Sequence, residues 1–309
     1  MNKIIQKKLN KIVKDIKAIK IQGATNVALA TLEGIKLVAN DYKGDDTRDI
    51  VKDAGERLSL ARENEPLARN AVKYVLDTIP SNSTDANVII KACDKYGEII
   101  RAAKKEIVKY GVEALKNEEV VLTHCHSSTS TSILIEVDRN RKEGGSSFRV
   151  VSTETRPLYQ GRKTARELFQ AGVDVTQIVD SANASFIIDD TYLPVGAVIV
   201  GCDELLKDGS FINKVGTYTI ALAAKEGKDE FYVATTLLKL DPNRDPRNTT
   251  IEQRESSEIW KDAPKGLKII NPAFEQINSS YVSRYITEAG LLKSKDLLSE
   301  AKKYYPWIF

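Results

Sequence analysis

The sequence has few cysteines, the residues that form disulfide bonds. Its 309 residues include three cysteines, Cys93, Cys125 and Cys202. Because they are odd in number and widely spaced, we expect no disulfide framework and a reduced, cytoplasmic protein. The sequence also lacks internal repeats and low-complexity tracts.

Histidine is scarcer still, and both histidines flank Cys125 in the stretch THCHSS. On an extended strand alternate residues share a face, so His124 and His126 would point one way and Cys125 the other. A tetrahedral zinc site needs its ligands together and companions from elsewhere in the chain. We therefore expect no metal site here, and no cofactor.

Long apolar runs and an excess of one charge are absent too. No segment approaches the roughly 20 apolar residues that cross a membrane, and the chain is charged from Lys3 onward, unlike a secretory signal. Forty-six basic residues stand against forty-three acidic ones, a net charge of +3. This balance predicts neither a membrane nor a nucleic acid as partner. Lysines recur between positions 3 and 20 with apolar residues among them, which favours a solvated helix face over an RNA-binding arm.

The pattern of apolar residues changes near residue 117. Before that point they recur at three- and four-residue spacing, which predicts a helical N-terminal domain over residues 1–116. Afterwards short apolar runs alternate with helical patterns; the runs are VVLTH, FRVVST, VDVTQIV, AVIVG and FYVAT. This alternation predicts an α/β fold with a doubly wound parallel sheet in a second domain over residues 117–309.

Ligands of such sheets bind beyond the carboxyl ends of the strands. Ser127 and Ser128 follow VVLTH and are suited to the N-terminus of a helix. Their hydroxyls can cap this helix, its free amides can hold an anion, and the helix end would lower the pKa of the neighbouring Cys125. Arg156 follows FRVVST and precedes a turn at Gln160 and Gly161. An arginine at this position is suited to bind an oxyanion.

The later strand ends offer similar side chains. Asp203 follows AVIVG, Asn213 and Lys214 precede the next helix start, and Lys239 follows FYVAT. Capping, a surface salt bridge or a solvated loop acid would explain each feature singly. Together, at one edge of one sheet, they predict a site for an anionic substrate.

The blocks LTHCHSS, TETRPLYQGR, IVGCDELLKDGSFINKVGT and NPAFEQ resemble the superfamily of sugar-phosphate aldose–ketose isomerases. It includes ribose-1,5-bisphosphate isomerases, methylthioribose-1-phosphate isomerases and regulatory subunits of translation initiation factor 2B, and the resemblance runs from about residue 15 to 290. It implies a helical N-terminal domain followed by a Rossmann-like domain. Cys125 and Asp203 match the family's catalytic pair, which implies that Cys125 abstracts a proton and that Asp203, with a raised pKa, returns one.

The resemblance also implies a set of substrate-binding residues: Gln22, Gly23, Ala24, Thr25, Arg62, Ser127, Ser128, Arg156, Gln160, Asn213, Lys214 and Lys239. The stretch ARENEPLARN and Lys239 resemble the bisphosphate branch, so we expect conversion of ribose-1,5-bisphosphate to ribulose-1,5-bisphosphate in nucleoside salvage. The family implies a homo-oligomer, either a dimer or a hexamer.

Three alternatives stay open. A methylthioribose-1-phosphate isomerase predicts an apolar recess at one end of the pocket, a regulatory subunit needs no chemistry, and a related isomerase would act on another pentose phosphate. Retention of both Cys125 and Asp203 favours an enzyme. The sequence departs from the family at Gln22, where an arginine is frequent, and at His126, where an asparagine is frequent. His126 either helps deprotonate Cys125 or replaces the hydrogen bond of the amide.

Overall fold

The computed structural model describes the chain except residues 1, 43, 45, 63, 81–83 and 190–191. The chain divides into two compact units. The first comprises Met1–Ala103, Leu238–Pro242 and Ala301–Phe309, and the second comprises Lys104–Leu237 and Asn243–Glu300. In the part of the chain that is described, no helix has the length and apolar character to cross a membrane.

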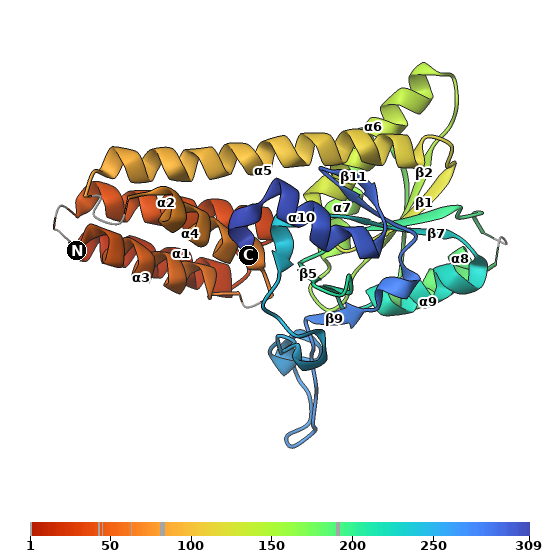
Figure 1. The fold of residues 1–309 in the computed structure, drawn as a ribbon. Helices are drawn as coiled ribbons and strands as arrows, with labels where there is room; N and C mark the ends of the chain where they lie inside the picture. Colours follow the sequence, from red (N-terminus) through yellow and green to blue (C-terminus); the bar gives the residue numbers. More distant parts are fainter. Residues whose placement is uncertain (1, 43, 45, 63, 81–83, 190–191) are drawn as a thin grey trace. The chain divides into compact units, whose positions relative to one another are not determined.

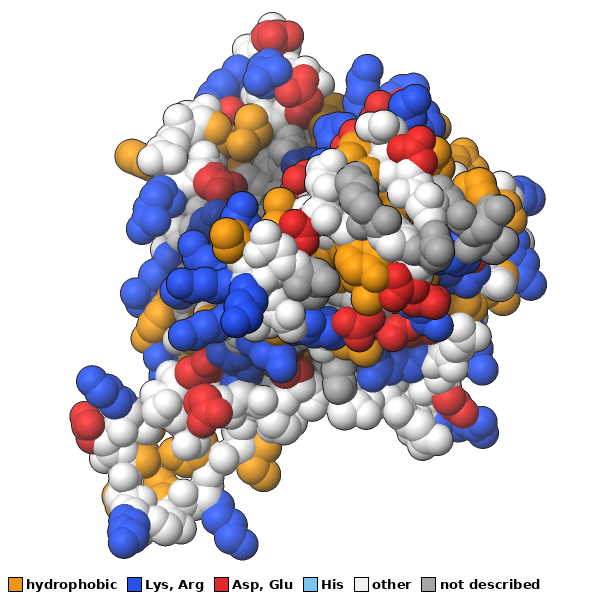
Figure 2. All heavy atoms as spheres, turned by 90° about the vertical axis from the view of Figure 1, so that its left-hand side faces the viewer, with side chains coloured by type: hydrophobic (Ala, Val, Ile, Leu, Met, Phe, Trp, Pro, Cys, Tyr) orange, Lys and Arg blue, Asp and Glu red, His pale blue; other side chains and the backbone are white. Residues whose placement is uncertain are grey.

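The first unit is built from amphipathic helices, as the apolar spacing predicts. They are α1 (Lys3–Lys17), α2 (Ala24–Asp41), α3 (Thr47–Ser59), α4 (Pro66–Thr78) and the first part of α5 (Ala86–Leu115). On α1, Leu9 and Ile16 are buried while the lysines are exposed, which confirms the solvated helix face. Figure 2 shows lysine and arginine side chains with acidic ones between them on the face that it views.

The C-terminal stretch YYPWIF belongs to the core of the first unit. It follows α10 (Leu297–Tyr304) and forms the turn η7 (Pro306–Ile308). The Trp307 ring packs edge-on against Tyr74 of α4, with ring centroids 5.1 Å apart, and Ile308 is buried. The strand β8 (Leu240–Asp241) also lies in this unit, where Asn70 donates to the carbonyls of Leu238 and Leu240.

The second unit contains the doubly wound sheet (Figure 1). Its strand order is β11-β10-β7-β4-β1-β2-β3, with all neighbours parallel except β10 and β11. The strands are β1 (Val120–His124), β2 (Arg149–Thr153), β3 (Asp174–Ile178), β4 (Ala197–Val200), β7 (Glu230–Ala234), β10 (Arg284–Thr287) and β11 (Gly290–Leu292). The predicted α/β class and the five predicted strands are confirmed. The order reverses between β1 and β4, the point where such sheets bind ligands.

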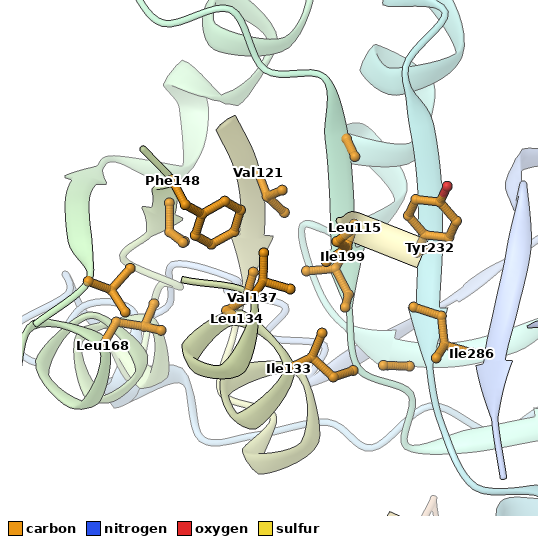
Figure 3. Close-up of a cluster of buried hydrophobic side chains, with 14 of the residues drawn as sticks. Leu115, Val121, Ile133, Leu134, Val137, Phe148, Leu168, Ile199, Tyr232 and Ile286 are labelled. Atoms are coloured by element: carbon orange, nitrogen blue, oxygen red, sulfur yellow. The ribbon is translucent and has the colours of Figure 1, made fainter. Parts of the chain in front are cut away.

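Helices cover both faces of this sheet (Figure 1). They are α6 (Ser128–Glu143), α7 (Gln160–Gln170), α8 (Asn183–Ile187) and α9 (Thr217–Gly227). Figure 3 shows Ile133 and Leu134 of α6 pointing toward Val121 of β1 and Ile199 of β4. Leu168 of α7 and Leu115 of α5 join the same buried cluster, whereas α9 packs on β4 and β7 from the other side.

Three further strands are present that the sequence did not predict. These are β5 (Glu204–Leu206), β6 (Phe211–Lys214) and β9 (Phe274–Ile277), paired antiparallel in the order β5-β6-β9. The remaining short turns are η1 (Asp180–Ala182), η2 (Leu237–Lys239), η3 (Pro246–Asn248), η4 (Ser256–Glu258), η5 (Ser279–Tyr281) and η6 (Ser294–Asp296). Asn213 and Lys214 therefore end a buried strand and do not lie in an open loop.

Candidate active site

Cys125 stands at the carboxyl end of β1, beside the point where the strand order reverses. Its φ is 67°, so the extended backbone ends at His124 and the expected alternation of side chains is wrong. The Cys125 amide donates to Thr155 Oγ1 at 2.9 Å, and its carbonyl accepts from Thr164 Oγ1 at 2.8 Å. Thr155 of the connection after β2 and Thr164 of α7 (Gln160–Gln170) therefore hold the peptide groups on both sides of this residue.

The two histidines contact different elements. His124 is buried, with Nδ1 2.6 Å from Thr153 Oγ1 and Nε2 2.9 Å from the carbonyl of Val215. Because a carbonyl only accepts, Nε2 carries the proton, and burial lowers the pKa of this ring. Gly216 lies against it, since a Cβ there would sit 2.9 Å from the ring. His124 is thus a structural, neutral side chain.

His126 points to α7. Its Nδ1 lies 3.0 Å from Thr164 Oγ1, and its Nε2 lies 4.0 Å from Glu167 Oε1. Burial lowers the pKa of this histidine as well. Among the described residues, no group of three or more His, Cys, Asp or Glu side chains is placed to hold a metal ion.

Ser127 caps α6, as the sequence suggested. Its hydroxyl accepts from the amide of Ser130 at 3.2 Å. A Cβ on Gly201, just after β4, would stand 2.8 Å from the Ser127 Cβ, so the two strand ends approach closely here. Ser128 is exposed at the first turn of α6.

Charges of both signs act on the Cys125 thiol. Burial raises its pKa to about 11, and the charges of Asp203 and Asp180 act in the same direction. The charge of Lys214 and a hydrogen bond from the His126 amide act the other way. The expected lowering of this pKa by the helix end is therefore wrong, because desolvation outweighs it. The thiol is neutral at pH 7.

Lys214 is a buried cation. Only 5% of it is exposed, and within the described part of the chain no carboxylate lies within ion-pair distance of its amine. Burying a charge without a partner is costly, so such a lysine is suited to an anionic ligand. Asn213 beside it is also buried and donates to Thr217 Oγ1 at 2.9 Å. The Asp203 amide donates to the Ile212 carbonyl at 2.9 Å, which ties the aspartate to β6.

The N-terminus of α9 is occupied by a carboxylate of the same unit. Glu275 of β9 reaches it, and its Oε1 accepts from the amides of Gly216 at 2.8 Å and Tyr218 at 2.6 Å. A carboxylate already satisfies the amides that would hold an anion. Burial raises the pKa of Glu275, although these two amides act to lower it.

The connection after β2 depends on Asp180, a residue that the sequence did not single out. The Asp180 carboxylate accepts from the amides of Thr155 at 2.7 Å and Arg156 at 2.6 Å. Thr155 has a φ of 62°, and the Arg156–Pro157 peptide is cis. Asp180 lies 24 residues from Arg156, beyond the next strand, so no local pattern signals the contact. It fixes the loop that carries Thr155 to Cys125.

Two predicted binding residues, Arg156 and Gln160, lie in this connection. The exposed Arg156 guanidinium donates to the Tyr159 hydroxyl at 2.6 Å and to the carbonyl of Ile259 at 3.1 Å. Gln160 begins α7, and its Oε1 is buried without a hydrogen-bond partner. A buried acceptor of this kind is suited to a ligand hydroxyl or a water molecule.

The structure brings eight of the predicted residues together in the second unit, at the ends of β1, β2, β4 and β6. They are Cys125, Ser127, Ser128, Arg156, Gln160, Asp203, Asn213 and Lys214. The other six lie in the first unit: Gln22, Gly23, Ala24, Thr25, Arg62 and Lys239.

The predicted residues of the first unit lie at three places: the start of α2, a buried position before α4, and the turn η2. Gly23, with φ 85°, is the N-cap of α2 without a capping side chain, so Ala24 and Thr25 begin this helix and are not part of a loop. Arg62 is buried, and its guanidinium lies 3.7 Å from the Glu65 carboxylate. Lys239 ends the turn η2.

Comparison with known proteins decides the family. The family model described as the initiation factor 2 subunit family matches residues 20–294. The chain belongs to the initiation factor 2 subunit family. Within this family, the ribose 1,5-bisphosphate isomerase of Methanocaldococcus jannaschii is 32% identical to the chain, covering 95% of the chain and 94% of the relative.

Other members of the initiation factor 2 subunit family are similar to the chain. The methylthioribose-1-phosphate isomerase of Heliobacterium modesticaldum is 31% identical, over 90% of the chain and 85% of the relative. A crystal structure of the Pyrococcus horikoshii translation initiation factor eIF-2B superposes with a TM-score of 0.81 at 25% identity, covering 93% of the chain and 97% of that protein. The chain is an isomerase of this family, with its Rossmann-like fold.

Proposed function

We propose that the chain is an aldose–ketose isomerase that converts ribose-1,5-bisphosphate to ribulose-1,5-bisphosphate. The observation that carries the proposal is the buried Lys214, whose charge acts on Cys125 together with that of Asp203. A thiol, a carboxyl group and a buried cation without a carboxylate partner are the groups that proton transfer on a phosphorylated sugar requires.

Cys125 and Asp203 are the proposed acid–base pair. A furanose with phosphate on its anomeric oxygen opens when an acid protonates the ring oxygen, and we assign this step to Asp203. Cys125, as thiolate, removes the proton from C2 to give an enol phosphate. The Cys125 thiol then gives this proton to C1, and the Asp203 carboxylate takes the proton of the C2 hydroxyl as the ketone forms, which restores both groups. Lys214 favours the thiolate and binds substrate oxygens. A raised pKa of Asp203 stays a prediction.

The choice of a bisphosphate rests on the number of cationic and amide groups. Lys214, Arg156 and the Ser127–Ser128 turn of the second unit are proposed to bind the substrate. Arg62, Lys239 and the α2 N-terminus around Gln22 stay predicted phosphate-binding residues, as the family resemblance implies. The relatives named ribose 1,5-bisphosphate isomerase support the same choice. We propose no metal, cofactor, nucleic acid or membrane for this activity.

We also propose that the protein is a homo-oligomer, a dimer or a hexamer. Several large apolar side chains of the second unit are exposed, among them Phe169 (74%), Tyr192 (63%) and Ile188 (47%). Sedimentation equilibrium should give a multiple of the 34.3 kDa chain mass, and a monomer at micromolar concentration would refute it.

Substitution of the two reacting side chains tests the assignment. Cys125→Ser replaces the thiol by a weaker acid, and Asp203→Asn removes the proton donor. Each should lower kcat by about a thousandfold or more, with little change in the unfolding transition. Cys93→Ala, which removes a thiol from α5 in the first unit, is the matched control and should keep kcat. Near-normal turnover in either site variant would refute the proposed roles.

A further inference from the structure

The backbone of Cys125 is in a conformation that needs support. Its φ of 67° lies in the left-handed region, which residues with a Cβ seldom adopt. Residues in such conformations persist when their surroundings fix them, and they cluster at functional sites. Here two buried hydroxyls supply the support, since Thr155 accepts from the Cys125 amide and Thr164 donates to the Cys125 carbonyl.

The bond to Thr164 also sets the direction of the next amide. In a planar trans peptide the carbonyl of Cys125 and the N–H of His126 point to opposite sides. Anchoring the carbonyl on Thr164 of α7 therefore turns the His126 N–H away from α7. This N–H acts to lower the pKa of the Cys125 thiol and so favours the thiolate. The Thr164 hydroxyl thus controls a donor that supports the reactive form of the cysteine.

The His126 ring determines which way the Thr164 hydroxyl points. A threonine hydroxyl has one proton, and Thr164 uses it on the Cys125 carbonyl. The contact of 3.0 Å between Thr164 Oγ1 and His126 Nδ1 must then be a donation from Nδ1–H. The other tautomer would draw the hydroxyl proton to the ring and leave the Cys125 carbonyl without its donor.

Charged groups on two helices surround the ring. Glu167 of α7 lies 4.0 Å from Nε2, and the charges of Lys163 on α7 and Lys104 on α5 also act on the histidine. The charges that act on the Cys125 thiol belong to other residues, namely Lys214, Asp203 and Asp180. Both ring nitrogens of His126 face residues of α7, Thr164 and Glu167, so this side chain reaches Cys125 through Thr164.

We propose that Thr164 and His126 are positioning residues for Cys125: the imidazole orients the threonine hydroxyl, and the hydroxyl orients the Cys125–His126 peptide so that its N–H meets the thiol. Of the two roles open to His126 from sequence, hydrogen bonding to a neighbour is the one assigned. The catalytic consequence rests on the proposed function, but the effect on the thiol does not, because thiol ionisation can be measured without substrate.

The test is the alkylation rate of Cys125 by iodoacetamide between pH 8 and 11, followed by peptide mass spectrometry in the full-length protein. Thr164→Val keeps the shape of the side chain and removes the hydroxyl, whereas Thr164→Ser keeps the hydroxyl. The valine variant should react about tenfold more slowly at pH 9, because one hydrogen bond to a charged group is worth roughly one pH unit of thiol ionisation. The serine variant should react at the wild-type rate.

His126→Leu provides a second, independent variant in case the valine variant does not fold. It should slow alkylation in the same direction, with a midpoint shifted to higher pH. Wild-type alkylation profiles in a folded Thr164→Val or His126→Leu variant would overturn the proposal. Where the wild type turns over substrate, Thr164→Val should lower kcat about tenfold and leave KM within about twofold. Absence of turnover in the wild type would refute the proposed function alone, since the alkylation comparison still stands.

Discussion

At the scale of single residues, Cys125 combines two opposing influences. Burial and the carboxylates of Asp180 and Asp203 hold the thiol protonated, while Lys214 and the His126 amide favour the thiolate. A residue in this balance changes its ionisation when any one neighbour is altered. The sign of each change follows from the sign of the neighbour's charge.

We predict opposite effects from removing the two charges. Lys214→Met removes a cation that stabilises the thiolate, so the pKa of Cys125 should rise above about 11 and alkylation at pH 9 should slow by about tenfold. Asp203→Asn removes an anion that opposes the thiolate, so the pKa should fall and alkylation should speed up by a similar factor. Alkylation rates across pH 8–11 measure both. Effects of equal sign in the two variants would contradict the electrostatic account.

The sequence indicated candidate residues for this site but not the contacts around them. Cys125, Asp203 and Lys214 could be found because each follows a strand or precedes a helix. The positive φ of Cys125 could not, because threonines 30 and 39 residues away impose it. For the same reason Asp180 was missed, since its contacts with the Thr155 loop form only when β2 and β3 pair.

At the scale of elements, the turn from β2 into α7 brings the supporting groups to Cys125. Gly161, in the first turn of α7, allows this helix to pack against the strand end. A Cβ at Gly161 would lie 1.8 Å from the Thr153 carbonyl oxygen and 2.8 Å from Thr155 Oγ1. Because the nearest atom belongs to the backbone, a rotamer change cannot relieve the clash.

Gly161→Ala should therefore disturb the turn that supports Cys125. We expect it to lower the free energy of unfolding by about 1–3 kcal/mol and to reduce kcat, as measured by urea denaturation and by turnover. Gly144→Ala is the control, because at that helix end the nearest atoms are 3.5 Å from the new Cβ and the backbone is ordinary. Equal stability of the two variants would show that the close approach at Gly161 does not matter.

Elements with regular periodicity were predictable, and elements defined by distant partners were not. VVLTH and AVIVG are continuous apolar runs, as buried parallel strands are, and both became strands at these positions. β5 has only three residues and pairs with β6 and, through it, with β9 some 60 residues later. The alternation of side chains in a three-residue strand is too short to be distinguished from a loop by sequence alone. The same hairpin buries Lys214, and its burial could not be predicted from the sequence.

At the scale of the whole molecule, the chain has two compact units and proposed substrate groups in each. The second unit carries the proposed acid–base pair and Lys214, whereas Arg62, Lys239 and the α2 N-terminus belong to the first. A bisphosphate offers a second charged group for charge-assisted contacts, which methylthioribose-1-phosphate lacks. We therefore expect the chain to prefer the bisphosphate.

A side-by-side assay of the purified chain with ribose-1,5-bisphosphate and methylthioribose-1-phosphate tests this claim most directly. We predict that kcat/KM is about a hundredfold higher for the bisphosphate, since charge-assisted contacts worth roughly 1.5–3 kcal/mol each are lost with the second phosphate. The product should be ribulose-1,5-bisphosphate, and Cys125→Ser should abolish its formation. A higher kcat/KM for methylthioribose-1-phosphate, or no turnover of either sugar, would contradict the account.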